Sequence, residues 1–378
     1  MSGRKLRVAL IGGPQYDQVD EALAAYTAEH GIGVEVVFRG DHVALNEHLA
    51  QALPGSARYD LVSTHAKYVS SQAGWLQPID PWLDFVDAGT FHPTALDLCR
   101  IGGSLLCLPR NIDARLLMAW TDVLPTPSWE PASWADLAAV ARSVANSSRA
   151  GFAFPARDSG LCGTYYELVA SGELSGDDAM RWLADLASHA GPASMVEDGW
   201  YFDEVSAAFV AGTVAMVGDW PGYWGRYPRT LKDEISVLRF PPGVDGRRRV
   251  YAGCHAWAIP ADAPDPIASA TLLRHLSSAT AARADAAAGM VPVRLDVPMP
   301  ADHPLDVRRA ELLQLTIVDD LLTFPSVPDH PQIETAAADA IRSALRGQVP
   351  FDQAAALARP AVAHLFTPSP DPTKESSA

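Results

Sequence analysis

The chain has 378 residues, of which 48% are hydrophobic and 20% are charged, and its formal net charge is −16 at pH 7. This length exceeds that of a typical single domain and fits two, and the composition allows a large buried core. A surface of this charge would repel a phosphate backbone, which excludes nucleic acid as a partner. No apolar stretch reaches the roughly 18 residues that a membrane span requires.

The first part of the chain alternates predicted strands and helices. Residues 7–11, 34–38 and 59–63 are short apolar or β-branched runs typical of strands. Between these runs, apolar residues recur at helical spacing in residues 19–26 and 43–53. This order predicts a mostly parallel sheet covered by helices, whose ligand would bind beyond the carboxyl ends of the strands. The candidate binding residues in the segments that follow these strands are Gln15, Tyr16, Asp41 and His65.

The rest of the chain is predicted to be mainly helical, with a few strands. Ser133 is placed to cap a helix that begins directly after it. Further helices are predicted at residues 164–170, 177–190, 204–211 and 266–287, then to about residue 366, and strands at residues 214–217 and 256–259. Residues 367–378 are polar and rich in proline, which predicts a disordered tail.

Five short motifs, all of them between residues 59 and 294, occur in an order typical of one family. They are YDLV with GWLQPI at 59–79, GGSLLCLP at 102–109, SWADL at 133–137, GTVAM with GDW at 212–220, and GMVPVR at 289–294. Each motif is weak alone. Their order and spacing together resemble the extracellular solute-binding proteins of ABC importers, specifically the family 1 group that includes maltose-type binders.

The resemblance implies a two-lobed, periplasmic-binding-protein-like (type II) α/β fold, each lobe a mostly parallel sheet flanked by helices. The N-terminal lobe would comprise residues 1–109 and 254–297, and the C-terminal lobe residues 110–253 and 298–366. Crossing segments at residues 108–113 and 253–258 would join them. A small ligand would bind in the cleft between the lobes and be enclosed by hinge closure.

The same resemblance implies a ligand, a partner and a location. The ligand would be a mono- or oligosaccharide, and a monomeric binding protein would deliver it to the permease subunits of an ABC transporter. The location implied is extracellular or at the cell surface. The opening segment carries no signal-peptide core before Gly12, so a cytoplasmic location stays the alternative.

Side chains near the crossing segments and after the strand at residues 214–217 complete the candidate ligand site. An aromatic ring can cover the C–H face of a sugar, and the loop after that strand carries three such rings. Carboxylates and guanidinium groups can each bind two adjacent hydroxyls. The candidates in this group are Arg110, Asp113, Asp219, Trp220, Tyr223, Trp224 and His255. The alternative for the three aromatic residues is packing against helices of the second lobe, and for Arg110 and Asp113 it is an interlobe salt bridge or hinge lock. Asp219 could instead cap a turn at Gly218, and His255 could have a structural role.

Common catalytic motifs are absent from the sequence. It contains no G-x-S-x-G elbow, Walker loop or H-E-x-x-H, and its four cysteines form no C-x-x-C pair. We therefore expect neither an enzyme nor a cofactor or metal site. Two alternatives stay open. Cys162, placed before the helix at residues 164–170, is a candidate nucleophile of an intracellular enzyme or sensor, similar to the thiaminase-like enzymes of this fold. The acidic composition also allows a cationic or amino-containing ligand.

Overall fold

The computed structural model describes residues 4–13, 16–55 and 58–366 of the chain. Within these residues, no helix is both long enough and apolar enough to cross a bilayer. Gln15, one of the predicted site residues, lies outside the described part, as does the tail predicted at residues 367–378.

The chain divides into two compact units, each assembled from three stretches of sequence. The first unit comprises residues 1–122, 218–239 and 250–331, and the second comprises residues 123–217, 240–249 and 332–378. The lobe boundaries expected from the resemblance differ from this division, chiefly in the placement of residues 218–239 and 298–331. Those boundaries stay a prediction.

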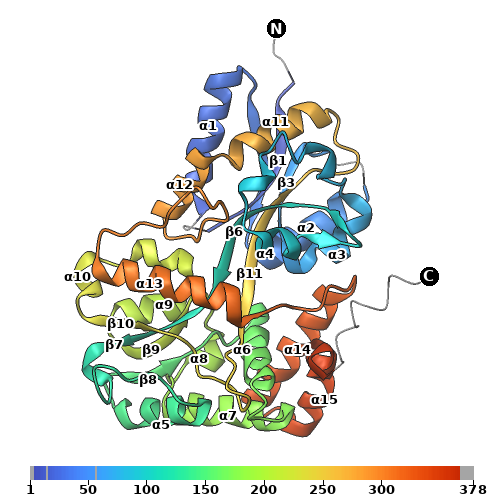
Figure 1. The fold of residues 1–378 in the computed structure, drawn as a ribbon. Helices are drawn as coiled ribbons and strands as arrows, with labels where there is room; N and C mark the ends of the chain where they lie inside the picture. The colour runs from blue at the N-terminus through green and yellow to red at the C-terminus, as the bar shows by residue number, and fades with distance from the viewer. Residues whose placement is uncertain (1–3, 14–15, 56–57, 367–378) are drawn as a thin grey trace. The chain divides into compact units, whose positions relative to one another are not determined.

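The first unit is built on a six-stranded sheet with helices on both faces (Figure 1). Its strands run in the order β12-β11-β3-β1-β2, and β6 pairs with β11 from outside this path. Strand β1 is parallel to β2 and β3, whereas β11 is antiparallel to β3 and β6. The bounds are β1 Leu6–Ile11, β2 Val34–Gly40, β3 Leu61–His65, β6 Leu108–Ala114, β11 Val250–Ala258 and β12 Leu321–Leu322.

Smaller strands complete the first unit. A short hairpin is formed by β4 and β5, and β7 and β10 form an antiparallel pair. Their bounds are β4 Arg100–Ile101, β5 Ser104–Leu105, β7 Leu116–Trp120 and β10 Ile235–Leu238. The two predicted crossing segments are therefore strands that pair with each other, β6 with β11. Strand β11 begins at Val250, earlier than the predicted start at residue 256, because its first residues pair with β6 and β12.

Two helices connect the parallel strands β1, β2 and β3 of this unit. Helix α1 (Gln18–His30) ends at Gly31, whose left-handed φ of 66° lets its N–H bond back to the carbonyl of Thr27. Helix α2 (His42–Ala52) begins after Asp41, whose carboxylate accepts from the N–H of Ala44. Besides two helices described in the next paragraph, the unit contains α3 Val69–Gln72, α4 Pro93–Leu98, α10 Arg229–Lys232 and α13 Pro304–Leu315. The predicted alternation of strand and helix over residues 7–63 is thus confirmed.

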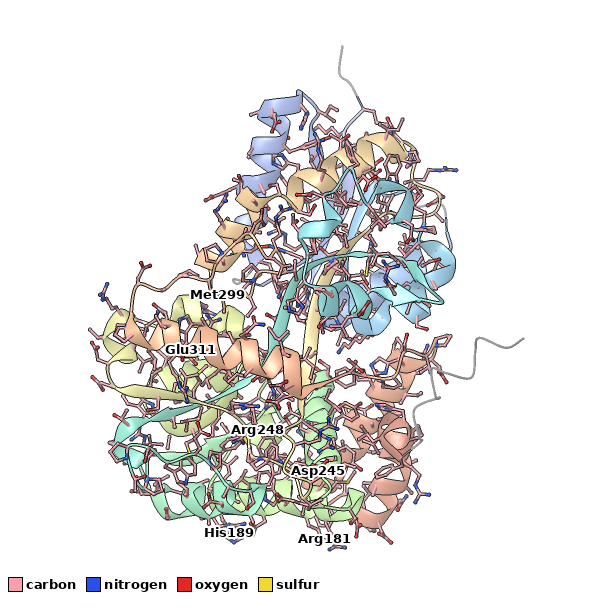
Figure 2. All side chains as sticks on the ribbon, in the orientation of Figure 1. Arg181, His189, Asp245, Arg248, Met299 and Glu311 are labelled. Carbon is pink, nitrogen blue, oxygen red and sulfur yellow. The ribbon has the colours of Figure 1, made fainter. Side chains whose placement is uncertain are left out.

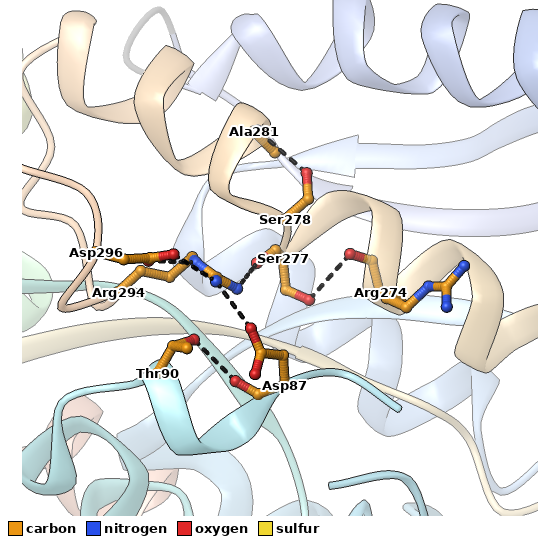
Figure 3. A network of polar contacts seen from close by, with 8 residues as sticks. All are labelled: Asp87, Thr90, Arg274, Ser277, Ser278, Ala281, Arg294 and Asp296. Atoms are coloured by element: carbon orange, nitrogen blue, oxygen red, sulfur yellow. Dashed lines mark hydrogen bonds and ion pairs between the residues drawn. The ribbon is translucent and has the colours of Figure 1, made fainter. Parts of the chain in front are cut away.

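The single long helix predicted at residues 266–287 is wrong. The segment forms α11 (Pro266–Leu276) and α12 (Ala279–Ala287), with a break at Ser277 and Ser278. The hydroxyl of Ser278 accepts from the N–H of Ala281 and caps α12. Arg294 donates to the carbonyl oxygen of Ser277, and the same guanidinium pairs with Asp296 and Asp87 (Figure 3). A guanidinium that binds this carbonyl from a distant segment is not visible in local periodicity.

The second unit packs its helices around the parallel strands β8 (Ala150–Ala153) and β9 (Val214–Asp219). Ser133 caps α5 as predicted, because its hydroxyl accepts from the N–H of Asp136. Helix α7 buries an apolar face and directs Arg181 and His189 away from the ribbon (Figure 2). The helices of this part of the chain are α5 Trp134–Val144, α6 Asp158–Ala170, α7 Gly176–His189, α8 Met195–Asp198, α9 Phe202–Val210, α14 His330–Leu345 and α15 Phe351–Val362.

Cys162 lies inside a helix rather than before one. Helix α6 begins at Asp158, whereas the sequence analysis placed its start at residue 164. The cysteine is 1% exposed, within a helix that is buried over most of its length. The expected position at a helix N-terminus, which would have favoured a thiolate, is therefore wrong.

Candidate functional site

Three paired strands of the first unit bring several predicted residues together. In the register of β6 and β11, Asp113 lies opposite Gly253 and Asn111 lies opposite His255. In the register of β3 and β11, His255 also lies opposite His65. Since side chains on a strand alternate between the two faces, residues at positions 253 and 255 share one face of β11.

Histidines and a tyrosine form the first part of the site. The Tyr16 hydroxyl lies 2.6 Å from Nε2 of His255. The ring of His255 lies 4.6 Å from that of His42 and 5.1 Å from that of His65, measured between centroids. Burial lowers the pKa of His42 to about 3 and lowers the pKa values of His65 and His255 well below their ordinary value. The three imidazoles are therefore neutral at pH 7.

The backbone around His65 supports its neutral form independently. Its Nδ1 faces the N–H of Lys67 at 3.2 Å, and its Nε2 faces the N–H of Cys254, also at 3.2 Å. An imidazolium carries a proton on both nitrogens and can accept from neither amide. A neutral imidazole keeps one nitrogen without a proton and so accepts from one of the two amides, whereas protonation of His65 would leave both amide N–H groups without an acceptor.

Buried polar atoms without a partner form the second part of the site. Within the described residues, no hydrogen-bond partner is present for Nη1 of Arg110, Oδ1 of Asn111, Oδ1 of Asp113 or Nδ1 of His255. Leaving such an atom unpaired costs about 1–3 kcal/mol. The four residues lie on the adjacent strands β6 and β11, and they offer both donor and acceptor atoms. Burial raises the pKa of Asp113 to about 7, although the hydrogen bond from Asn111 acts in the opposite direction.

Gly253 lies where the polar and aromatic parts of the site meet. A Cβ atom at this position would lie 3.3 Å from Cβ of Asp113, 3.3 Å from Cζ3 of Trp220 and 3.5 Å from Nε2 of His65. The Trp220 ring lies edge-on to Tyr251 at 5.0 Å, and Tyr251 in turn lies 5.1 Å from Phe324. A side chain at Gly253 would therefore press against a carboxyl-bearing residue, an indole and an imidazole.

Arg110 is held by a neighbouring helix. Its guanidinium forms two hydrogen bonds, of 2.9 and 2.8 Å, with the carboxylate of Asp285 on α12, and it lies 5.5 Å from the ring of Tyr16. Arg110 also borders a cavity of about 300 Å³ that is lined mainly by α1, α11 and α12. Among the predicted site residues that the structure describes, no other lines that cavity, so we treat the cavity as separate from the site at Gly253.

Other predicted residues have partners within the fold. The Asp41 carboxylate caps α2 and is exposed. Asp219 accepts from the hydroxyl of Tyr227 and from the N–H of Trp220. The indole N–H of Trp224 donates to Asp306 at 2.7 Å, and the side chain is buried. Tyr223 is also buried, and the guanidinium of Arg226 lies 5.8 Å from its ring. Asp41, Asp219, Tyr223 and Trp224 thus have packing or capping roles. The predicted residues that the structure groups together are Tyr16, His65, Arg110, Asp113, Trp220 and His255.

Several residues of the grouped site were not among those predicted from the sequence. His42, Asn111 and Gly253 lie beside predicted residues in the chain, and Tyr251 and Phe324 complete the aromatic row. A signal for part of this set was present: Tyr251, Gly253 and His255 are spaced by two, as residues on one face of a strand are. Phe324 gave no such signal, since it follows a two-residue strand.

Comparison with known proteins places the chain in a family. The family model for bacterial extracellular solute-binding proteins matches residues 21–307, well over half of the chain. The chain belongs to this family. A search of curated protein sequences found no match for this solute-binding protein.

Solved structures support the same fold. The maltose-bound MalE3 protein of T. maritima is 20% identical, with a TM-score of 0.84 over 96% of this chain and 100% of that one. The GacH receptor of Streptomyces glaucescens is 22% identical, with a TM-score of 0.77 over 96% and 99% of the two chains. An ABC transporter solute-binding protein of Agrobacterium vitis is 17% identical, with a TM-score of 0.80 over 96% and 98%. The solute-binding protein therefore has the two-lobed periplasmic-binding-protein fold that the sequence analysis predicted.

Proposed function

We propose that this solute-binding protein binds a carbohydrate at the face of β6 and β11 around Gly253, and that it serves an ABC importer without catalysing a reaction. The four unpartnered polar atoms of Arg110, Asn111, Asp113 and His255 carry this proposal. A sugar hydroxyl both donates and accepts, so a ring of hydroxyls satisfies a mixed set of this kind. The ring of Trp220, next to Gly253, supplies an apolar face for the C–H groups of the sugar.

The ligands of similar structures agree with this choice. The proteins from T. maritima, Streptomyces glaucescens and Agrobacterium vitis are described with maltose, acarbose and D-mannitol, respectively. All three ligands are rich in hydroxyl groups. At these identities the likeness concerns the fold, and the choice of a polyhydroxylated ligand for this chain depends on the polar atoms named above.

A neutral ligand fits the charges around the site better than a cationic one. The Lys67 ammonium lies 5.4 Å from the Phe324 ring, and the Arg115 guanidinium lies 5.1 Å from the Tyr251 ring. A cationic ligand on the aromatic row would be placed beside these two positive groups, which repel it. The nearby Asp113 offers less than a full negative charge at neutral pH because its pKa is about 7.

The role in transport follows from the family. Members are extracellular solute-binding proteins, so we place this protein outside the cell membrane, where it would present its ligand to a permease. Hinge closure around the ligand and a monomeric state are part of the same proposal.

The proposal is tested by a binding screen on the parent protein and on a variant substituted at Gly253. Maltose, acarbose, D-mannitol and a panel of mono- and oligosaccharides are titrated into the full chain, with tryptophan fluorescence and calorimetry as the two signals. Gly253→Ala places a methyl group among Asp113, Trp220 and His65, and we expect it to weaken binding of the responding sugar by roughly tenfold or more, ~1.4 kcal/mol. Gly74→Ala is the matched control, because a Cβ at Gly74 meets nothing within 4 Å.

The outcomes separate the site from the ligand class. A sugar that binds the parent protein and the Gly74 variant but not the Gly253 variant supports both parts of the proposal. Equal affinity in all three proteins would move the site elsewhere. If no sugar of the panel binds while an amine such as a polyamine does, the carbohydrate assignment is wrong.

A further inference from the structure

Glu29, His30 and His275 gather on the first unit, where the last residues of α1 meet those of α11. One ligand atom from each residue lies within 4.8 Å of the others. The Glu29 carboxylate is 3.7 Å from Nε2 of His30 and 3.5 Å from Nδ1 of His275. None of the three belongs to the ligand site at Gly253.

A backbone contact fixes which nitrogen of His275 is available. Its Nε2 lies 3.0 Å from the carbonyl oxygen of Ala22 on α1. Because a carbonyl only accepts, Nε2 carries a proton, and Nδ1, on the side of Glu29, is the ring nitrogen that is available to a metal. Metal-ligating histidines are commonly oriented by this kind of bond from the second ring nitrogen to a backbone carbonyl.

The side chain of Tyr26 packs against both imidazoles. Its ring is fully buried and lies 4.5 Å from the ring of His30 and 5.4 Å from that of His275. A rigid tyrosine between α1 and α11 therefore limits the positions that the two histidines adopt. This support reduces the ordering cost of bringing three ligands to one ion.

Simple ion pairing accounts for this cluster less well than a metal does. Two imidazoles point to a single carboxylate, so a charged form of both would place two positive rings within a few ångströms of each other. A divalent metal uses the neutral imidazoles together with the carboxylate and creates no such repulsion.

We propose that Glu29, His30 and His275 bind a divalent transition metal of the zinc class. Tetrahedral zinc with bonds of about 2.0–2.2 Å places its ligand atoms about 3.3–3.6 Å apart. In the structure Nε2 of His30 lies 3.7 Å from Oε1 of Glu29, and Nδ1 of His275 lies 3.5 Å from Oε2 of the same carboxylate. Two imidazoles and one carboxylate favour Zn²⁺, Cu²⁺ or Ni²⁺ over Mg²⁺ and Ca²⁺, which prefer oxygen ligands. The side chains are 63%, 25% and 18% exposed, respectively, so an ion reaches them from solvent. The bound ion would link α1 to α11.

The test measures zinc binding by the full chain without a histidine tag. Chelator-treated protein is dialysed to equilibrium against micromolar ZnCl₂, and bound zinc is determined by atomic emission. We expect about one zinc per chain at this site and a rise in the melting temperature with Zn²⁺ but not with Mg²⁺ or Ca²⁺. His30→Ala and Glu29→Gln are each expected to weaken zinc binding by at least roughly tenfold.

A second histidine–carboxylate pair provides the control. His189 lies 3.1 Å from Asp185 on α7, is 64% exposed and points away from the ribbon (Figure 2), but no third ligand gathers with this pair in the described chain. His189→Ala should leave zinc binding unchanged. Undiminished binding in His30→Ala and Glu29→Gln, an equal response to Mg²⁺, or no zinc bound by the parent protein would each overturn the proposal. Circular dichroism of the two site variants excludes misfolding as the cause of a loss.

Discussion

Replacing Asp113 by asparagine should change how the stability of the protein depends on pH. Burial raises the pKa of Asp113 from an ordinary value of 3.8 to about 7. The native protein therefore keeps a proton that the unfolded chain has already lost between these values. Stability from this group is fully present below about pH 4 and falls as the pH rises toward 7.

The magnitude follows from the width of that interval. Each pH unit in which only the native state holds the proton reduces the free energy of unfolding by about 1.36 kcal/mol. Between about pH 5 and about pH 8, the native state holds the extra proton only up to its pKa of about 7, which is roughly two pH units. The free energy of unfolding therefore falls by about 2.7 kcal/mol over this range. The asparagine of the Asp113→Asn variant cannot ionise, and its amide oxygen can still accept from the side chain of Asn111.

Urea unfolding followed by tryptophan fluorescence measures the effect. The Asp113→Asn variant should gain about 2.7 kcal/mol on the parent protein between about pH 5 and about pH 8, because only the parent loses stability through this group. Asp41→Asn is the control: Asp41 is exposed, and asparagine caps a helix as well as aspartate does. A difference between the Asp113→Asn variant and the parent that stays flat with pH would refute the argument from burial.

Three further changes have defined outcomes. Trp220→Ala should weaken sugar binding by roughly tenfold, as measured by calorimetry. The control is Trp82→Ala, which should leave the affinity unchanged because the Trp82 ring lies beside Phe85, away from the proposed site. The pKa of His42 is about 3 in the native protein, so the contribution of His42 to stability is present above about pH 6.5 and is lost as the pH falls. The unfolding constant should rise through this group by up to roughly tenfold per pH unit. His42→Gln should reduce this pH dependence in urea unfolding at acid pH. Cys162 should react with iodoacetamide only after unfolding, and mass spectrometry that locates fast labelling there in the native protein would contradict its burial.

The order of elements in the first unit could be predicted because it depends on local patterns. Strands at residues 7–11, 34–38 and 59–63 alternate with amphipathic helices, and the parallel pairing of β1 with β2 and β3 follows from that order. The predicted ends of helices were less accurate than the predicted order of elements where a residue distant in sequence contacts the helix end. The break between α11 and α12 depends on Arg294, which binds the carbonyl of Ser277 from beyond the second helix.

The candidate site could be predicted only in part for a similar reason. His65 and Asp113 were chosen because they lie at strand ends or crossing segments, and the registers of β3, β6 and β11 place them near one another. The distinction between Trp220, which borders Gly253, and Trp224, which donates to Asp306, depends on tertiary contacts. Both tryptophans occur in the same short loop, so composition and spacing could not separate them.

Gly253 links the fold of the first unit to its proposed function. A glycine inside a strand costs roughly 0.5–1 kcal/mol relative to alanine, because it loses more backbone freedom on folding. Nothing in the pairing of β11 requires that residue, since no left-handed φ is present at this position. A Cβ at this position would lie 3.3 Å from Cβ of Asp113 and 3.3 Å from Cζ3 of Trp220, so a side chain would require these neighbours to shift. Because both neighbours belong to the proposed site, we expect Gly253→Ala to weaken sugar binding, and an unchanged affinity in calorimetry would contradict the placement of the site at Gly253.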